Sequence, residues 1–171
     1  MKPYVFGPVT WLTAVAQGQP GQRTFYVQAG KDDLMGRFWL EKEQLLALAT
    51  GIDRLLAALE AKRGIVPVRE DASCLNPAPD VPPTAEFKIG QLSLAYDEGQ
   101  DMVALLLGEL DAPDDETAAT CWASRAQMRA FSRRIVEVCA AGRPVCPLCS
   151  GPVNPEGHIC PRSNGHREIQ V

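Results

Sequence analysis

The chain has 171 residues, enough to bury a hydrophobic core without disulfide bonds, and 46% of them are hydrophobic, as in folded globular proteins. Its net charge of −4 argues against nonspecific binding to nucleic acids or anionic membranes, because both need a basic surface. No stretch of 18 apolar residues occurs, and glycine and proline interrupt the N-terminal apolar residues. We therefore expect neither a membrane span nor a signal peptide.

The first 63 residues predict strands followed by a helix. Residues 9–16 and 23–29 are rich in β-branched and aromatic side chains and flank the turn-forming stretch QGQPGQ, which is typical of a β-hairpin. Residues 37–40 add a short third strand. From about residue 41 to residue 62, leucine and isoleucine recur at spacings of three and four, which predicts an amphipathic helix.

The same pattern starts again after a proline-rich segment. Residues 64–85 hold five prolines, which predicts an extended linker or crossover. Residues 87–96 then alternate between apolar and polar, and residues 102–110 form an apolar strand. A second helix is expected after the acidic loop at residues 111–117, with its start within residues 121–135 and its end near residue 141.

Residues 1–63 and 86–142 thus predict an α+β fold of two ββ(β)α units, whose strands form an antiparallel sheet with a helix on each unit. The starts of the two helices can be overlaid, with Trp39 on Trp122 and Gln44 on Gln127, so an internal duplication is a hypothesis. Residues 143–171 are expected to form a separate, small metal-binding tail.

The tail gathers the residue types that bind metals. Cys146 and Cys149 have the C-x-x-C spacing that lets two thiolates reach one ion, Cys160 follows, and His158 and His166 are the only histidines of the chain. Since a structural zinc site needs four ligands, we expect one zinc ion held by three cysteines and one histidine, and the spacing leaves open which histidine. Catalytic zinc with an open position and a redox-active dithiol are the alternatives.

Three segments, PGQRTFYVQA, LEKEQLLALA and CPLCSGPVNPEGHICPRSNGHR, resemble in this order an uncharacterised bacterial family, domain of unknown function 3090. The resemblance covers essentially the whole chain. It implies a cytoplasmic bacterial protein with a C-terminal zinc-ribbon-like element, whose cysteines and histidines match those of the tail. It implies no activity, although genes for a phosphomutase-like and a kinase-like protein often lie beside those of the family.

Three arginines on the expected second helix form a further candidate site. Arg125, Arg129 and Arg133 recur every four residues and would give an anion-binding face. The alternative is a solvated face paired with the acidic loop at residues 109–116.

The sequence contains no G-x-G-x-x-G, P-loop, G-x-S-x-G or H-E-x-x-H motif, so we lean against an enzyme. We expect a non-enzymatic, cytoplasmic binding or scaffold protein that meets a protein partner through its zinc-bearing tail. One alternative is a nucleic-acid-binding protein with the duplicated topology of PUR and Whirly proteins, which the acidic charge disfavours. The other is an enzyme or accessory protein acting on a phosphorylated small molecule.

Overall fold

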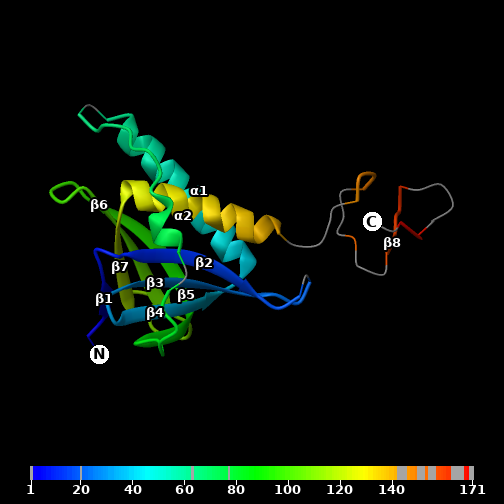
Figure 1. The fold of residues 1–171 in the computed structure, drawn as a ribbon, viewed down its shortest axis with the longest axis horizontal. Coiled ribbons are helices and arrows are strands. Elements are labelled where there is room, and N and C mark those ends of the chain that lie inside the picture. Colours follow the sequence, from blue (N-terminus) through cyan, green and yellow to red (C-terminus); the bar gives the residue numbers. More distant parts are fainter. Residues whose placement is uncertain are drawn as a thin grey trace.

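The protein is represented by a computed structural model that describes residues 2–19, 21–62, 64–76, 78–141, 146–149, 153, 157–162 and 168–169. It confirms the α+β class, with one seven-stranded sheet and two α-helices among these residues. Figure 1 shows both helices on the same side of the rolled sheet. The internal duplication stays a hypothesis.

The elements alternate along the chain much as the sequence patterns predict. Their bounds are β1 (Tyr4–Phe6), β2 (Trp11–Gln17), β3 (Thr24–Lys31), β4 (Leu34–Leu40), α1 (Lys42–Glu60), the 3-10 helix η1 (Ala72–Leu75), β5 (Ala85–Asp97), β6 (Met102–Glu109), β7 (Ala119–Ser124), α2 (Arg125–Ala140), β8 (His158–Ile159) and β9 (Glu168–Ile169).

The strand that directly precedes the second helix was not expected. Residues 119–124 form strand β7, which pairs with β6 and buries every second side chain, and α2 begins at Arg125. Ser124 ends the strand and caps the helix, because its hydroxyl accepts a hydrogen bond from the backbone N–H of Gln127 while the Gln127 side chain accepts from the backbone N–H of Ser124. Strand β1, too short for a visible alternation, was not expected.

The strand order in the main sheet is β1-β7-β6-β5-β4-β3-β2. Strands β2 to β4 form one antiparallel meander and β5 to β7 form another. The two meanders meet where β4 pairs with β5 in parallel, and β1 pairs with β7 in parallel as well. Each half of the chain therefore contributes a three-stranded meander to one continuous sheet, and β1 adds the seventh strand.

The N-terminal segment joins the two ends of this sheet. Strands β1 and β2 are consecutive in the chain, yet they stand at opposite ends of the strand order. Between them, the N–H of Val9 donates to the carbonyl of Trp122 at the end of β7, at 2.9 Å. The N–H of Thr10 donates to the carbonyl of Gly30 on β3, also at 2.9 Å. The sheet is consequently rolled, with its ends bridged by residues 7–10.

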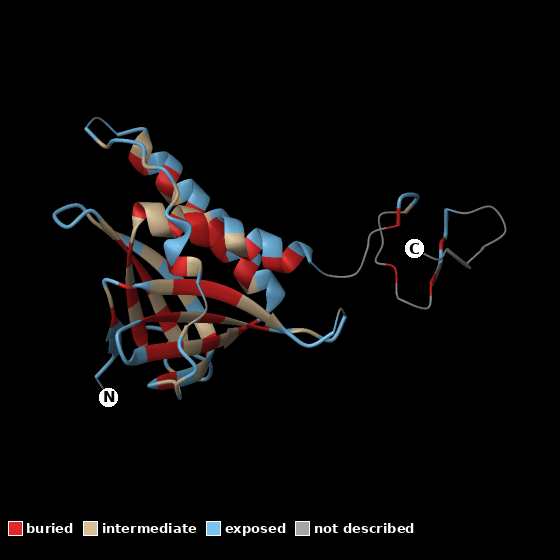
Figure 2. Ribbon diagram, in the orientation of Figure 1, coloured by how far each residue is buried: buried red, intermediate tan, exposed pale blue. Residues whose placement is uncertain are grey.

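Both helices cover the interior of the rolled sheet. Helix α2 packs mainly on α1 and on β2, whereas α1 contacts β5, so each helix lies on a strand from the other half of the chain. Their buried side chains form the main core together with the strands, and the largest of them are Leu45, Ile52, Leu56, Met128, Phe131 and Ile135. Figure 2 shows buried residues along the strands and on both helices.

Among the described residues, no helix combines the length and the apolar character needed to cross a membrane.

Candidate metal centre

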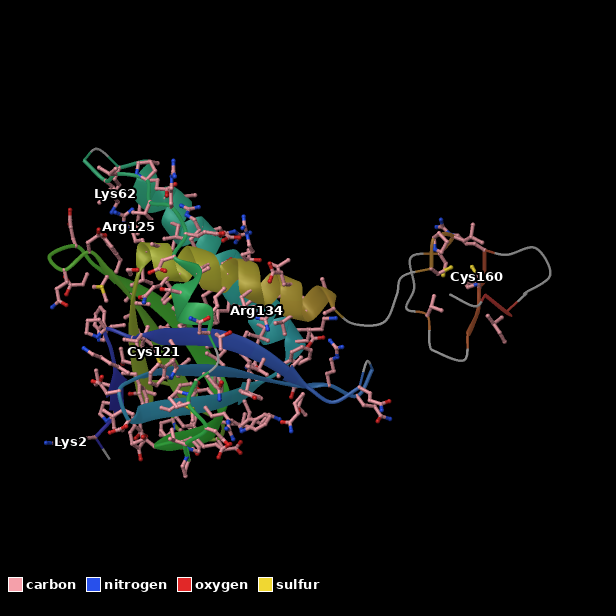
Figure 3. All side chains as sticks on the ribbon, in the orientation of Figure 1. Lys2, Lys62, Cys121, Arg125, Arg134 and Cys160 are labelled. Carbon is pink, nitrogen blue, oxygen red and sulfur yellow. The ribbon has the colours of Figure 1, made fainter. Side chains whose placement is uncertain are left out.

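Three cysteines of the tail converge on one point. The sulfur atoms of Cys146, Cys149 and Cys160 all lie within 4.8 Å of one another. Figure 3 shows Cys160 and the sulfur atoms near it. Cys146 and Cys160 are buried and Cys149 is half-buried, and together with the buried Val153 they form a small cluster separate from the main core. The apolar side chains that the described part of this cluster buries are too few to fold it by hydrophobic burial alone.

The distance between two of these sulfurs fits a shared metal ion. Cys146 Sγ and Cys160 Sγ are 3.8 Å apart, whereas a disulfide bond would bring them to about 2 Å. Four ligands at a Zn–S distance of about 2.3 Å, arranged as a tetrahedron, place neighbouring sulfurs about 3.8 Å apart. None of the six cysteines is in a disulfide. The arrangement can therefore supply three thiolates to one tetrahedral ion.

Short turns and a two-stranded ribbon hold these sulfurs in place. Residues 147–149 form a turn, and β8, which directly precedes Cys160, pairs antiparallel with β9. Gly157, directly before β8, has a φ of +101°, a conformation that side-chain-bearing residues rarely adopt. Arg162 Nη1 donates to the carbonyl of Leu148 at 3.5 Å and so links the two cysteine-bearing turns. The sequence patterns gave no indication of this last contact.

The described residues do not show which histidine is the fourth ligand. The backbone of His158 lies in β8, but its side chain is outside the described part of the structure, and so is the whole of His166. The expectation that one of them completes the site stays a prediction.

The other three cysteines lie in or beside the main core and have a different chemistry. Burial raises the pKa of the Cys74 thiol to about 11 and that of Cys121 to about 12, and it also raises the pKa of Cys139. These thiols are therefore protonated at neutral pH, which makes them poor nucleophiles and poor metal ligands.

Arg125, the first residue of α2, is nearly buried and makes a bidentate pair with Asp101. Its Nε and Nη2 donate to the two carboxylate oxygens at 2.6 and 3.0 Å, and its Nη1 donates to the carbonyl of Val66 at 2.8 Å. Figure 3 shows Arg125 near Lys62, which lies two residues beyond the end of α1. Arg125 thus ties the β5–β6 turn and the segment after α1 to the start of α2.

The other two arginines of the candidate anion-binding face also have carboxylate partners. Arg129 pairs with Glu60 at the end of α1, and Arg133 pairs with Glu70 at 2.6 Å. The alternative expectation, pairing with the acidic loop at residues 109–116, was therefore wrong about the partners, which come from other elements. The anion-binding role of the three arginines stays a prediction.

The fold and the cysteine site define an α+β protein with a rolled sheet and a small cysteine-rich tail. The family model described as "Protein of unknown function (DUF3090)" matches residues 4–160, and the chain belongs to this family. Comparisons with curated proteins and with solved structures find no match.

Proposed function

We propose that this protein is a non-enzymatic, cytoplasmic binding or scaffold protein whose tail is shaped by one structural zinc ion. The single observation that carries the proposal is the convergence of Cys146, Cys149 and Cys160 within 4.8 Å. Zinc fits this donor set, because thiolates and imidazole are the ligands that zinc prefers in closed tetrahedral sites. The proposed fourth ligand is His158 or His166.

The role of the metal in this proposal is to fold the tail. Among the described residues, Val153 is the only other side chain that the cysteine cluster buries, so in this proposal metal binding supplies most of the free energy that orders the cluster. A tail that the metal holds rigid presents a surface to which a protein partner can bind. A reducing cytoplasm is consistent with six cysteines that form no disulfide.

The test is the metal content of the purified protein, measured by plasma mass spectrometry on the wild type and on Cys149→Ser. We expect one zinc ion per chain in the wild type and its loss in the variant, because serine is a poor zinc ligand. Cys139→Ala is the matched control, since it also removes a thiol but lies at the end of α2, and it should keep its zinc.

Thermal melting of the same three proteins separates the tail from the main core. The principal transition should persist in Cys149→Ser, because the tail cysteines belong to a cluster of their own. Wild-type protein that contains no metal when purified without chelators would contradict the proposal, and the dithiol alternative would then be the one to pursue.

A further inference from the structure

A second candidate site lies on the outer face of the sheet, around Trp39. On β4, Phe38 and Leu40 are buried in the core, so Trp39 between them points to the opposite face, which the helices do not cover. A pocket of about 220 Å³ opens beside it, and its lining includes Arg23, Trp39, Glu41 and Lys88. This volume is large enough for one aromatic ring with a small substituent.

The Trp39 ring is held in position before any ligand arrives. Its indole N–H donates to Glu86 Oε1 at 3.0 Å, and its ring centroid lies 4.8 Å from that of Tyr26, directly across on β3. A ring fixed on two sides loses little conformational entropy when a planar molecule stacks on it.

The charge in the pocket is unbalanced. Lys88, which faces Trp39 from β5, pairs with Glu41 at 3.2 Å, and both side chains are largely exposed. Among the described residues, Arg23 has no carboxylate partner, and its Nε is covered by protein without a hydrogen-bond partner. The Nε of Arg37 on the same face also lacks a hydrogen-bond partner, but Arg37 has a carboxylate partner, because its Nη1 pairs with Glu86. An arginine held against a pocket without a counterion lacks the anion that such a group ordinarily binds.

We propose that this pocket binds a small aromatic anion, with its planar ring against Trp39 and its phosphate or carboxylate group on Arg23. Stacking on tryptophan tolerates many rings, whereas the guanidinium selects for the planar or tetrahedral anionic group by charge-assisted hydrogen bonds. A free nucleotide and a nucleotide within a single strand share this chemistry, and the free small molecule is the source that a pocket of this size fits. The inference is independent of the zinc site.

The experiment follows the three tryptophan indole N–H signals by ¹H–¹⁵N NMR while UMP or benzoate is added to the full-length protein. Trp39→Phe assigns the Trp39 signal. We expect that signal to shift with UMP, with benzoate or with both, while those of Trp11 and Trp122, which lie outside the pocket, stay in place. Arg23→Gln should weaken binding about tenfold, and Lys88→Gln less, since the charge of Lys88 is partly neutralised by Glu41.

The control is Arg54→Gln, which removes the same charge from an exposed position on α1 and should leave the affinity unchanged. Three results would overturn the proposal. The first is a Trp39 signal that does not move at about 10 mM of either probe, a concentration that saturates a millimolar site. The second is binding by Arg23→Gln and Lys88→Gln that is as tight as that of the wild type. The third is binding of a ten-nucleotide oligo(dU) where UMP and benzoate do not bind, which would assign the face to single strands instead.

Discussion

At the scale of single residues, the carboxylate of Asp101 accepts an unusual number of side-chain hydrogen bonds for a residue in an exposed turn. It accepts two hydrogen bonds from Arg125 and a third from the hydroxyl of Tyr96, at 2.7 Å. The bonds from Arg125, and then that from Tyr96, hold the pKa of this carboxyl below its usual range, while the bond to Asp101 raises the pKa of Tyr96. The contribution of Asp101 to stability is therefore present above the unfolded-state pKa of about 4 and is lost as the pH falls through the lower, folded-state value.

Asp101→Asn tests this pair without disturbing the backbone. Asp101 has a φ of +51°, and asparagine tolerates this left-handed conformation as well as aspartate does. Because the Asp101 side chain is about half exposed, we expect a loss of only about 1 kcal/mol in the free energy of unfolding at pH 7, measured by urea denaturation.

The difference between wild type and Asp101→Asn should shrink as the pH falls below about 4, because the carboxyl of the unfolded chain then becomes protonated before the folded one, whose pKa is lower. Asp32→Asn is the control, because Asp32 also lies in a hairpin turn with a φ of +55° but has no carboxylate-to-arginine pair among the described residues. A pH-independent difference would contradict the assigned role of the charge.

At the scale of the elements, the glycine inside α1 is a position where a substitution should stabilise the protein. Gly51 lies inside the helix, and a Cβ there would meet Leu94 Cδ1 at 3.5 Å, an ordinary van der Waals contact. Gly51→Ala should therefore raise the free energy of unfolding by up to about 1 kcal/mol, because alanine loses less backbone entropy in a helix.

Gly36→Ala on strand β4 is the same substitution at a position where it should destabilise the protein. A Cβ at Gly36 would stand 2.2 Å from Phe38 Cζ, so the substitution forces a core ring to move and should cost about 1–3 kcal/mol. Urea denaturation of both variants gives the comparison. Equal effects of the two substitutions would mean that the local contacts assigned to these glycines are wrong.

At the scale of the whole molecule, β1 closes the rolled sheet through Phe6. Its ring is buried and lies 5.9 Å from that of Phe38 on β4, although β1 and β4 are not neighbours in the sheet. Phe6→Ala should lower the free energy of unfolding by about 3 kcal/mol or more, because it leaves a cavity between the two ends of the sheet.

Val5→Ala is the control for Phe6→Ala. Val5 is the preceding residue on the same short strand, but 58% of it is exposed, so its truncation should change the stability by no more than about 0.5 kcal/mol. Calorimetric or urea-induced unfolding of both variants compares the two losses in the free energy of unfolding. Similar losses would show that β1 contributes by its backbone pairing and not by the ring.

The sequence by itself determined the local structure wherever the pattern was long. The heptad-like leucines of α1, the alternating β5 and the apolar β6 all lie close to their expected bounds, because hydrophobic periodicity reflects which face is buried. The spacing of Cys146, Cys149 and Cys160 likewise predicted that their sulfur atoms lie close together, as they do in the structure. The S-x-x-Q capping box at Ser124 was also visible in the sequence and would have placed the start of α2 at Arg125.

Only the tertiary structure decided how these pieces combine. The parallel pairing of β4 with β5, the closure by the three-residue β1, and the packing of each helix on a strand of the other half depend on contacts between residues far apart in the chain. The same holds for the carboxylate partners of the helix arginines and for the pocket beside Trp39, whose residues come from three strands and their ends. A short-range pattern records burial and spacing, but it does not record which distant surface provides the burial.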